Sequence, residues 1–276
     1  GLTSDGSLLQ PGSDKKASGL FSASGTTTGT MHHFYLHHNV ITNPNCEYIQ
    51  LGGTVDSVIA FNTLTGQTCN AINLNGNSHG IYVGGQSNRS ERITIENNYI
   101  SGAKEYGIHV YPDGAGIVVR NNFLTGNCTT FQGAAIILYG DGHQIYNNVV
   151  ANNNGPQGCD GILLRGPTNT VIYNNTIYNN SRSAIIDEYA SSSVTCKNNL
   201  MIGNGSTIGL GCPIVGGNFT TGSASHFADA ANGDFRLCTA AGVPHASCVG
   251  ASAAIDAGVP LGAPYNIDIV GTSRPQ

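Results

Sequence analysis

The chain has 276 residues, enough for one large domain or two small ones with a buried core. Charged residues make up only 10% and the net charge is −5, so the sequence does not favour nucleic-acid binding. It contains no apolar run long enough to favour membrane insertion. Apolar residues make up 39% and recur regularly, which predicts a folded protein.

Residues 1–30 show little pattern, and we expect them to form a lead-in or cap. A repeat follows, marked by an asparagine that recurs at steps of 23, 36, 24, 26, 27 and 24 residues. Large apolar residues, with one cysteine, stand three positions before each anchor, and large apolar residues stand two positions after it. A period of this length indicates a solenoid. The anchors are Asn39, Asn62, Asn98, Asn122, Asn148, Asn175 and Asn199.

Alternating polar and apolar residues around each anchor, as in ITIENNYI, predict short β-strands. A second strand in each repeat opens with Gly or Ala: GIYV, GIHV, AIIL, GILL and AIID begin at residues 80, 107, 135, 161 and 184. Three short strands per repeat predict an all-β fold, a parallel β-helix of about seven or more coils over residues 31–210. We expect each anchor asparagine to adopt the left-handed conformation at a sharp bend and to hydrogen-bond to its neighbours in a ladder.

The GIxV and IxIxNNxI coil pattern of residues 31–203 resembles that of the secreted right-handed parallel β-helix proteins, the pectate-lyase-like superfamily. In residues 211–276, which we expect to cap the helix, NGDFRL, SAAIDAG and IDIVGTSRP resemble a tail common after such helices. The resemblance implies an extracellular protein that processes polysaccharides. It also implies that the strand opening with Gly or Ala carries the site.

Eight cysteines without a CxxC motif argue against a zinc site and for disulfides in an oxidising, extracellular setting. Equivalent offsets in adjacent coils predict the pairs Cys46–Cys69 and Cys128–Cys159, and a short loop predicts Cys238–Cys248. Cys196 stands in an inward column, so it is either a buried thiol or, as parity favours, the partner of Cys212.

Candidate site residues come from the strand that opens with Gly or Ala. Its second residue should point inward, and its third and fifth should point outward on every coil. This alternation predicts one face that carries Tyr82, His109, Tyr111, Tyr139, Arg165 and Glu188, with Asp113 and Asp141 at its edge. Tyrosines beside an acid, a base and a cation suit a long polar polymer such as a polysaccharide.

A second outward row lies two residues before the anchors, and we interpret it mainly as a solvated face with a Glu96–Arg120 ion pair. The histidines of MHHFYLHHN should point to different faces, which argues against a metal site at residues 32–38. We expect His143 to be a hydrogen-bonded structural residue and His79 to border the first face. His109 is the strongest functional candidate.

The leading hypothesis is a secreted polysaccharide lyase that cleaves a uronate-containing glycan by β-elimination. Arg165 would neutralise the uronate carboxylate, and His109 or Tyr139 would serve as base and acid. Tyr82, Tyr111 and Glu188 would bind substrate. No cofactor is required, although Asp113 and Asp141 could add Ca²⁺.

Two other functions stay open. A glycoside hydrolase on the same scaffold would need two carboxylates, drawn from Asp141, Asp160, Asp187 and Glu188. A non-catalytic glycan-binding or structural surface protein is equally compatible with a repeat fold, because a fold alone does not fix a function.

Overall fold

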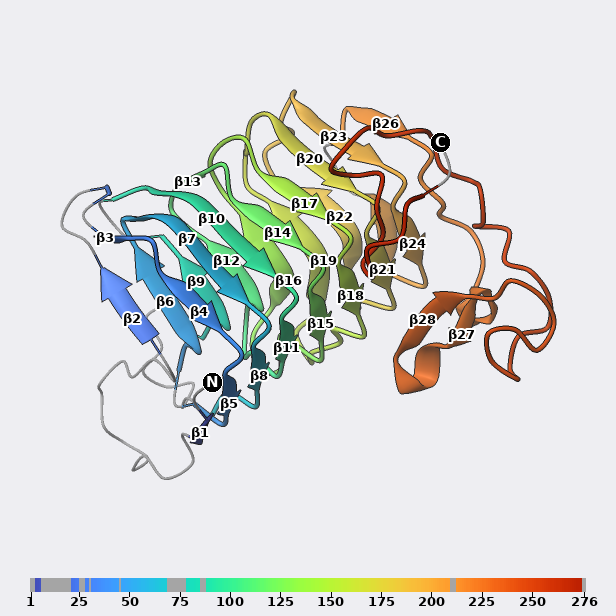
Figure 1. Ribbon diagram of the computed structural model, residues 1–276, viewed down its shortest axis with the longest axis horizontal. Coiled ribbons are helices and arrows are strands. Elements are labelled where there is room, and N and C mark those ends of the chain that lie inside the picture. The colour runs from blue at the N-terminus through green and yellow to red at the C-terminus, as the bar shows by residue number, and fades with distance from the viewer. Residues whose placement is uncertain are drawn as a thin grey trace.

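The computed structural model describes residues 3–5, 21–24, 28–29, 31–44, 46–68, 78–84, 88–208 and 212–274. These residues form the predicted all-β fold, a right-handed parallel β-helix whose coils stack along one axis (Figure 1). The helix has about six turns, slightly fewer than the seven or more expected. Helical structure in the described residues is limited to the 3₁₀ turns η3 (Ala224–His226) and η4 (Ala230–Asn232).

Three parallel sheets form the walls of the helix. Sheet A contains β1 (Thr3–Asp5), β5 (Val40–Thr42), β8 (Thr63–Thr65), β11 (Tyr99–Ser101), β15 (Phe123–Thr125), β18 (Val149–Ala151), β21 (Thr176–Tyr178) and β24 (Leu200–Ile202). Sheet B contains β2 (Phe21–Ser24), β6 (Ile49–Gly52), β9 (Ile81–Val83), β12 (Ile108–Val110), β16 (Gly133–Leu138), β19 (Cys159–Leu164), β22 (Ser183–Asp187) and β25 (Ser206–Ile208). Sheet C contains β3 (Met31–His32), β4 (Tyr35–His37), β7 (Thr54–Ala60), β10 (Ser90–Glu96), β13 (Gly114–Ala115), β14 (Val118–Arg120), β17 (Gln144–Tyr146), β20 (Thr170–Tyr173), β23 (Val194–Lys197) and β26 (Ile214–Gly216). Strands β1 and β2 lie in the expected lead-in and pair with sheets A and B.

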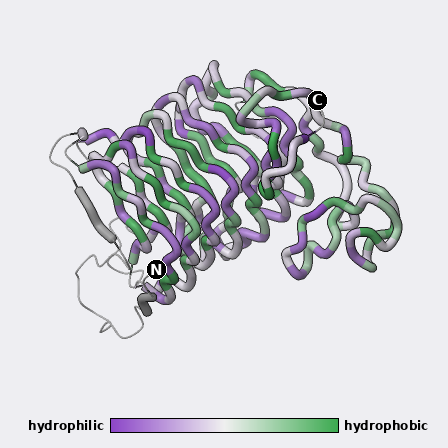
Figure 2. The backbone as a smooth tube through the Cα atoms, viewed as in Figure 1, coloured by the Kyte–Doolittle hydropathy of each residue, from purple (hydrophilic) through white to green (hydrophobic). Residues whose placement is uncertain are grey.

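The apolar columns of the repeat form one continuous core between the sheets. In sheet A, for example, Ile100 pairs with Leu124 and Leu124 with Val150, and all three are fully buried. Figure 2 shows apolar and polar positions alternating along the coils and lining up between them. The inward positions predicted around the anchor asparagines, and in the strand that opens with Gly or Ala, are therefore confirmed.

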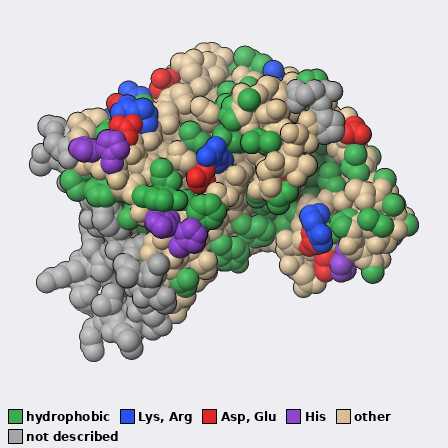
Figure 3. Space-filling view, in the orientation of Figure 1, with side chains coloured by type: hydrophobic (Ala, Val, Ile, Leu, Met, Phe, Trp, Pro, Cys, Tyr) green, Lys and Arg blue, Asp and Glu red, His purple; other side chains and the backbone are tan. Residues whose placement is uncertain are grey.

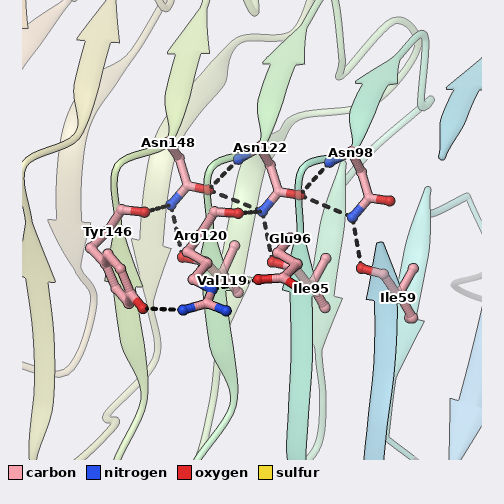
Figure 4. Close-up of polar contacts among 9 residues, drawn as sticks. All are labelled: Ile59, Ile95, Glu96, Asn98, Val119, Arg120, Asn122, Tyr146 and Asn148. Atoms are coloured by element: carbon pink, nitrogen blue, oxygen red, sulfur yellow. Dashed lines mark hydrogen bonds and ion pairs between the residues drawn. The ribbon is translucent and has the colours of Figure 1, made fainter. Parts of the chain in front are cut away.

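The anchor asparagines form the predicted ladder inside the bend between sheets C and A (Figure 4). The side-chain amide of Asn122, for example, donates to Asn148 Oδ1 at 3.0 Å and to the carbonyl of Ile95 at 2.8 Å, and its own Oδ1 accepts from Asn98 at 3.0 Å. The ladder runs unbroken from Asn39 to Asn199 and ends on Asn218. It satisfies buried backbone groups that the turn leaves without partners.

The expectation that the anchors themselves adopt the left-handed conformation is wrong. The residue before each anchor does so, with φ between 53° and 56° at every such corner, because the chain must turn before the anchor side chain can point inward. These corner residues are His38, Phe61, Asn97, Asn121, Asn147, Asn174 and Asn198. A second ladder, which the sequence pattern did not indicate to us, joins Asn127, Asn153, Asn180 and Asn204 at the next bend.

Three predicted disulfides are present, namely Cys128–Cys159, Cys196–Cys212 and Cys238–Cys248. They indicate that the protein folds in an oxidising compartment. The fourth predicted pair involves Cys69, which lies outside the described residues.

The C-terminal tail packs along the corner between sheets C and A (Figure 1). Side-chain amides on three successive coils donate to its backbone carbonyls at 2.8 Å: Asn147 to Ile267, Asn174 to Tyr265, and Asn198 to Val259. The antiparallel hairpin of β27 (Phe227–Asp229) and β28 (Asp234–Leu237) packs Phe235 against Phe123 and Tyr178 of sheet A. One outward side of the last coils is therefore covered by the chain itself.

His143 is a fully buried structural residue, as expected. Its Nδ1 accepts from the Ile117 amide at 3.2 Å, and its Nε2 lies 2.8 Å from the carbonyl oxygen of Tyr139. Burial lowers the pKa of His143 from 6.5 to about 4. Between these two pH values His143 is therefore protonated in the unfolded chain but neutral in the folded protein.

We expect the free energy of unfolding to fall by about 2–3 kcal/mol between pH 7 and pH 4.5 because of His143 alone. The contribution is complete above pH 6.5 and is lost as the pH falls toward 4, since only the unfolded state binds the proton in that window. Urea unfolding of the wild type and of His143→Asn at both pH values measures this. Asparagine keeps an acceptor for Ile117 but does not titrate, so an equal pH dependence in both proteins would contradict the assignment.

Candidate functional site

The outward side of sheet B, together with the residues directly before and after its strands, carries the candidate site; we call it the B face. The Gly or Ala that opens the repeated strand motif and the residue after it both face the core, as in Gly107 with Ile108 and Ala135 with Ile136. A Cβ on Gly107 would lie 2.6 Å from the carbonyl oxygen of Ala135 and 3.0 Å from Leu124 in the core, so the backbone there approaches its neighbours too closely for most side chains. As a result, Tyr106 and His109 both project outward and lie side by side.

Rings from two adjacent coils form a cluster on the B face, which we call the ring cluster. His109 lies at its centre, with ring centroids 4.2 Å from His79 and 4.6 Å from Tyr106. Tyr82 and Tyr111 complete the cluster, at 5.3 and 5.4 Å from His109. The structure thus brings together the predicted His109, Tyr82 and Tyr111, and His79 is part of the cluster rather than its border.

The expectation that His109 is exposed on the surface is wrong, because only 8% of it is accessible. The residues in register with His109, Ile137 and Leu163, are also buried, and they form an outer apolar layer with Tyr106 and Ala134. Alternation correctly predicts that these positions point away from the core. It does not predict that bulky outward neighbours bury one another.

A row of polar contacts crosses three coils next to the ring cluster, and we call it the Tyr–Arg–Glu row. Arg165 donates from Nη1 to the Tyr139 hydroxyl at 2.8 Å and from Nε to Glu188 at 2.5 Å. Tyr139 also lies 5.0 Å from Tyr111, which joins the row to the cluster. All four residues were predicted to share a face, and Tyr111 is the most accessible aromatic among them at 39%.

Glu105 is a site residue that the sequence reasoning missed. It stands two residues before the Gly that opens the strand motif, at a position that the sequence analysis did not consider. Its Oε2 accepts from the Ser78 hydroxyl at 2.9 Å and lies 3.9 Å from Nδ1 of His79. The signal that could have found it is the EY pair directly before GIHV, which places an acid and an aromatic ring beside the strand.

Burial controls the protonation of the cluster. It lowers the pKa of His109 well below the ordinary range, with further lowering from His79 and Arg165, so the imidazole is neutral. It raises the pKa of Tyr82 to about 12 and also raises that of Tyr106, so both are protonated phenols. Burial raises the pKa of Glu105 as well, against the hydrogen bonds from Ser78 and Tyr106. A neutral imidazole, protonated phenols and a carboxyl of raised pKa form a set suited to proton transfer.

One polar atom of His109 has no partner among the described residues: its Nδ1 is buried and neither donates nor accepts a hydrogen bond there. Such an orphaned polar atom is uncommon in a folded interior and is more frequent where a site binds or transfers something. Arg165 is near enough to influence the pKa values of His109, Tyr106 and Glu105. The ring cluster and the Tyr–Arg–Glu row therefore act as one electrostatic unit.

The two aspartates proposed for calcium lie in the turn between sheets B and C. Asp113 faces Arg89 at 3.6 Å, and Asp141 accepts from Thr168 at 2.5 Å and from Asn169 at 2.9 Å. Within the described ranges, no group of three or more His, Cys, Asp or Glu side chains is arranged to hold a metal ion.

The carboxylates considered for hydrolysis are largely committed to backbone groups. Asp187 is fully buried and accepts from the amides of Tyr189 at 3.1 Å and Ser191 at 2.8 Å. Asp160 is buried, accepts from the Ser183 amide at 2.8 Å and pairs with Arg182 at 3.0 Å. Such contacts fix turns between coils, so neither Asp187 nor Asp160 is well placed to act as one of a hydrolytic pair of carboxylates.

The second outward row follows sheet C and contains the expected ion pair, with Arg120 Nε 2.5 Å from Glu96 (Figure 4). Arg120 also donates to the Tyr146 hydroxyl at 2.9 Å. Further along, Tyr146 and Tyr173 both pack edge-to-face on Tyr265 of the tail. The tail therefore covers the later part of this face, while the B face has no such cover among the contacts described.

None of the helices in the described part of the chain has the length and apolar content that crossing a bilayer requires. Comparison with known proteins gives no match among curated proteins and none among solved structures. The family described as "Right handed beta helix region" matches residues 15–150 and 57–234, which together cover most of the chain. The protein therefore belongs to the right-handed β-helix family.

Proposed function

We propose that this is a secreted polysaccharide-processing protein of the pectate-lyase-like type and that its B face cleaves a uronate-containing glycan by β-elimination. The observation that carries the proposal is the continuity of the Tyr–Arg–Glu row with the ring cluster. Three disulfides support an extracellular setting.

Each part of the B face has a task in this reaction. Tyr111, which is more accessible than Tyr139, offers a ring face on which a sugar ring can pack. Arg165 has one guanidinium nitrogen, Nη2, outside its bonds to Tyr139 and Glu188, and this nitrogen would pair with the uronate carboxylate. Pairing with a cation stabilises the negative charge that develops when the C5 proton leaves.

The elimination step transfers two protons. A base removes the C5 proton, the electron pair forms the C4–C5 double bond, and the bond from C4 to the glycosidic oxygen breaks. Tyr139 would protonate the departing oxygen, and Arg165 would stabilise the resulting phenolate until the base returns its proton through water. His109, neutral because it is buried, and Glu105, with its raised pKa, are the two groups able to act as the base.

A non-catalytic glycan-binding surface is the second candidate function. The low accessibility of His109 favours it, since a base must reach the proton that it removes. The exposed rings of Tyr111 and Tyr189 would bind sugars without any chemistry. Hydrolysis is less well supported, because Asp187 and Asp160 are committed to turns.

Incubation with pectin, alginate, glycosaminoglycans and neutral glycans tests the proposal. We expect ultraviolet-absorbing unsaturated products from one uronate polymer and a rate at least about 100-fold lower in the variant that lacks the base, His109→Phe or Glu105→Gln. New reducing ends without ultraviolet absorbance would show a hydrolase instead. Binding without cleavage would support the second candidate function, a non-catalytic glycan-binding surface.

Calcium can be tested in the same assay. The proposed step assigns charge neutralisation to Arg165, with Asp113 and Asp141 as the positions through which Ca²⁺ would add to it. If EDTA abolishes the activity, Ca²⁺ restores it and Asp113→Asn impairs it, then Ca²⁺ takes part in the reaction.

A further inference from the structure

Two pairs of adjacent histidines stand on the outer surface at the N-terminal end of the coil stack, His32 with His33 and His37 with His38. In Figure 3, histidine side chains form two separate groups near this end of the molecule. All four residues are exposed. In a regular strand, adjacent side chains point to opposite faces, and the sequence therefore argues against a shared ligand.

The backbone overturns that argument, because His33 and His38 have the left-handed conformation, with φ of 58° and 53°. A left-handed residue breaks the alternation and turns two successive side chains toward the same side. The Nδ1 atoms consequently lie 2.6 Å apart in the first pair and 2.8 Å apart in the second. Hydrogen bonds from the His33 and His38 amides to Val55 and Ala60 of β7 hold both corners in place.

The Nδ1–Nδ1 separation of the second pair, 2.8 Å, is close to that of two ligands of one metal ion, and the first pair, at 2.6 Å, would open slightly to bind one. Imidazole nitrogens bind first-row divalent ions at about 2.0–2.1 Å, so two nitrogens at adjacent positions of a square-planar site lie about 2.9 Å apart. In a tetrahedral site the two ligating nitrogens would lie about 3.3 Å apart, so the two rings of each pair would have to move further from each other. The observed geometry therefore favours Cu²⁺ over Zn²⁺, in the same direction as the general affinity order.

The second pair is the better organised of the two. The His37 ring stacks on Tyr35 with centroids 4.1 Å apart, and the His38 ring stacks on Phe61 at 5.0 Å. Stacking restricts the rotamers of both ligands before the metal arrives, which reduces the entropy lost on binding. Among the described residues, the ring contact of the His32–His33 pair is an edge-to-face contact between its own two rings.

We propose that the two histidine pairs are separate chelating sites for a late first-row divalent metal ion, with Cu²⁺ bound most tightly and the His37–His38 pair the stronger site. Each pair supplies two Nδ1 ligands, and water or an external ligand completes the coordination. Binding displaces the proton shared between the two nitrogens, because both must be unprotonated to bind the ion. This proposal does not depend on the function proposed for the B face.

Titration calorimetry with Cu²⁺ in a non-chelating buffer tests it on the full chain. We expect two ions per chain, with His38→Asn and His33→Asn each removing one and the double variant removing both. Asparagine is the matched substitution at His38, because Asn97 and Asn121 occupy the corresponding corners of later coils with φ of 54° and 55°. It also suits His33, because asparagine adopts the left-handed conformation more readily than most residues. His245→Asn in the tail is the control and should still bind two ions.

The ligand chemistry has an independent readout. The electron paramagnetic resonance spectrum of bound Cu²⁺ should show coupling to two nitrogens per site, and Zn²⁺ should bind at least about tenfold more weakly. Absence of binding below about 100 µM, or a stoichiometry unchanged in His33→Asn/His38→Asn, would overturn the proposal.

Discussion

Replacing Arg165 with glutamine is expected to lower kcat/KM on a uronate polymer at least about 100-fold. Glutamine keeps a hydrogen-bond donor near Tyr139 but removes the positive charge that would pair with the substrate carboxylate. The loss should fall largely on kcat, because the negative charge at C5 and on the carboxylate develops in the transition state. Initial rates from the ultraviolet absorbance of the unsaturated product measure the effect.

The molecule contains its own matched control for this variant. Arg120 on sheet C has the same two contacts as Arg165, with Nε 2.5 Å from Glu96 and Nη1 2.9 Å from Tyr146. Arg120→Gln should therefore change stability as much as Arg165→Gln does, by about 1 kcal/mol or less, and leave activity unchanged. Equal activity in the two variants would contradict the placement of the site on the B face.

Replacing Asn122 with alanine is expected to lower the free energy of unfolding by about 3–5 kcal/mol. The substitution removes donors to Ile95, Arg120 and Asn148 and the acceptor for both amide groups of Asn98. Asn122 is fully buried, so water cannot replace these bonds without opening the coil. Urea unfolding followed by circular dichroism measures the change.

The neighbouring corner residue provides the comparison. Asn121 has φ of 55° and no place in the ladder, so Asn121→Gly keeps the left-handed corner and should cost about 1 kcal/mol or less. If Asn122→Ala and Asn121→Gly were equally mild, the ladder would not be a main source of stability. Because repeat proteins can unfold in parts, the midpoint should be compared by two spectroscopic signals.

Much of the fold is predictable because a solenoid is built from contacts between neighbouring coils. The asparagine period alone gives the stacking of Asn98 on Asn122 and of Ile100 on Leu124, since equivalent residues of adjacent coils must lie in register. The same logic places Cys128 beside Cys159 and aligns Tyr139 with Arg165. The order of the residues along the Tyr–Arg–Glu row is therefore a property of the sequence.

The tertiary structure alone decides where the alternation of inward and outward side chains breaks, and which outward side chains are buried by other parts of the chain. Two consecutive inward residues at Gly107 and Ile108 place the Tyr106 ring beside His109, which strict alternation does not predict. Left-handed corners bring His37 and His38 to one side for the same reason.

The burial of His109, and of Tyr146 beneath Tyr265, depends on side chains and segments far apart in the sequence. Sequence periodicity therefore determines the coil and its register. Local backbone bends and long-range packing determine which outward groups meet, which remain accessible, and hence what chemistry is available to them.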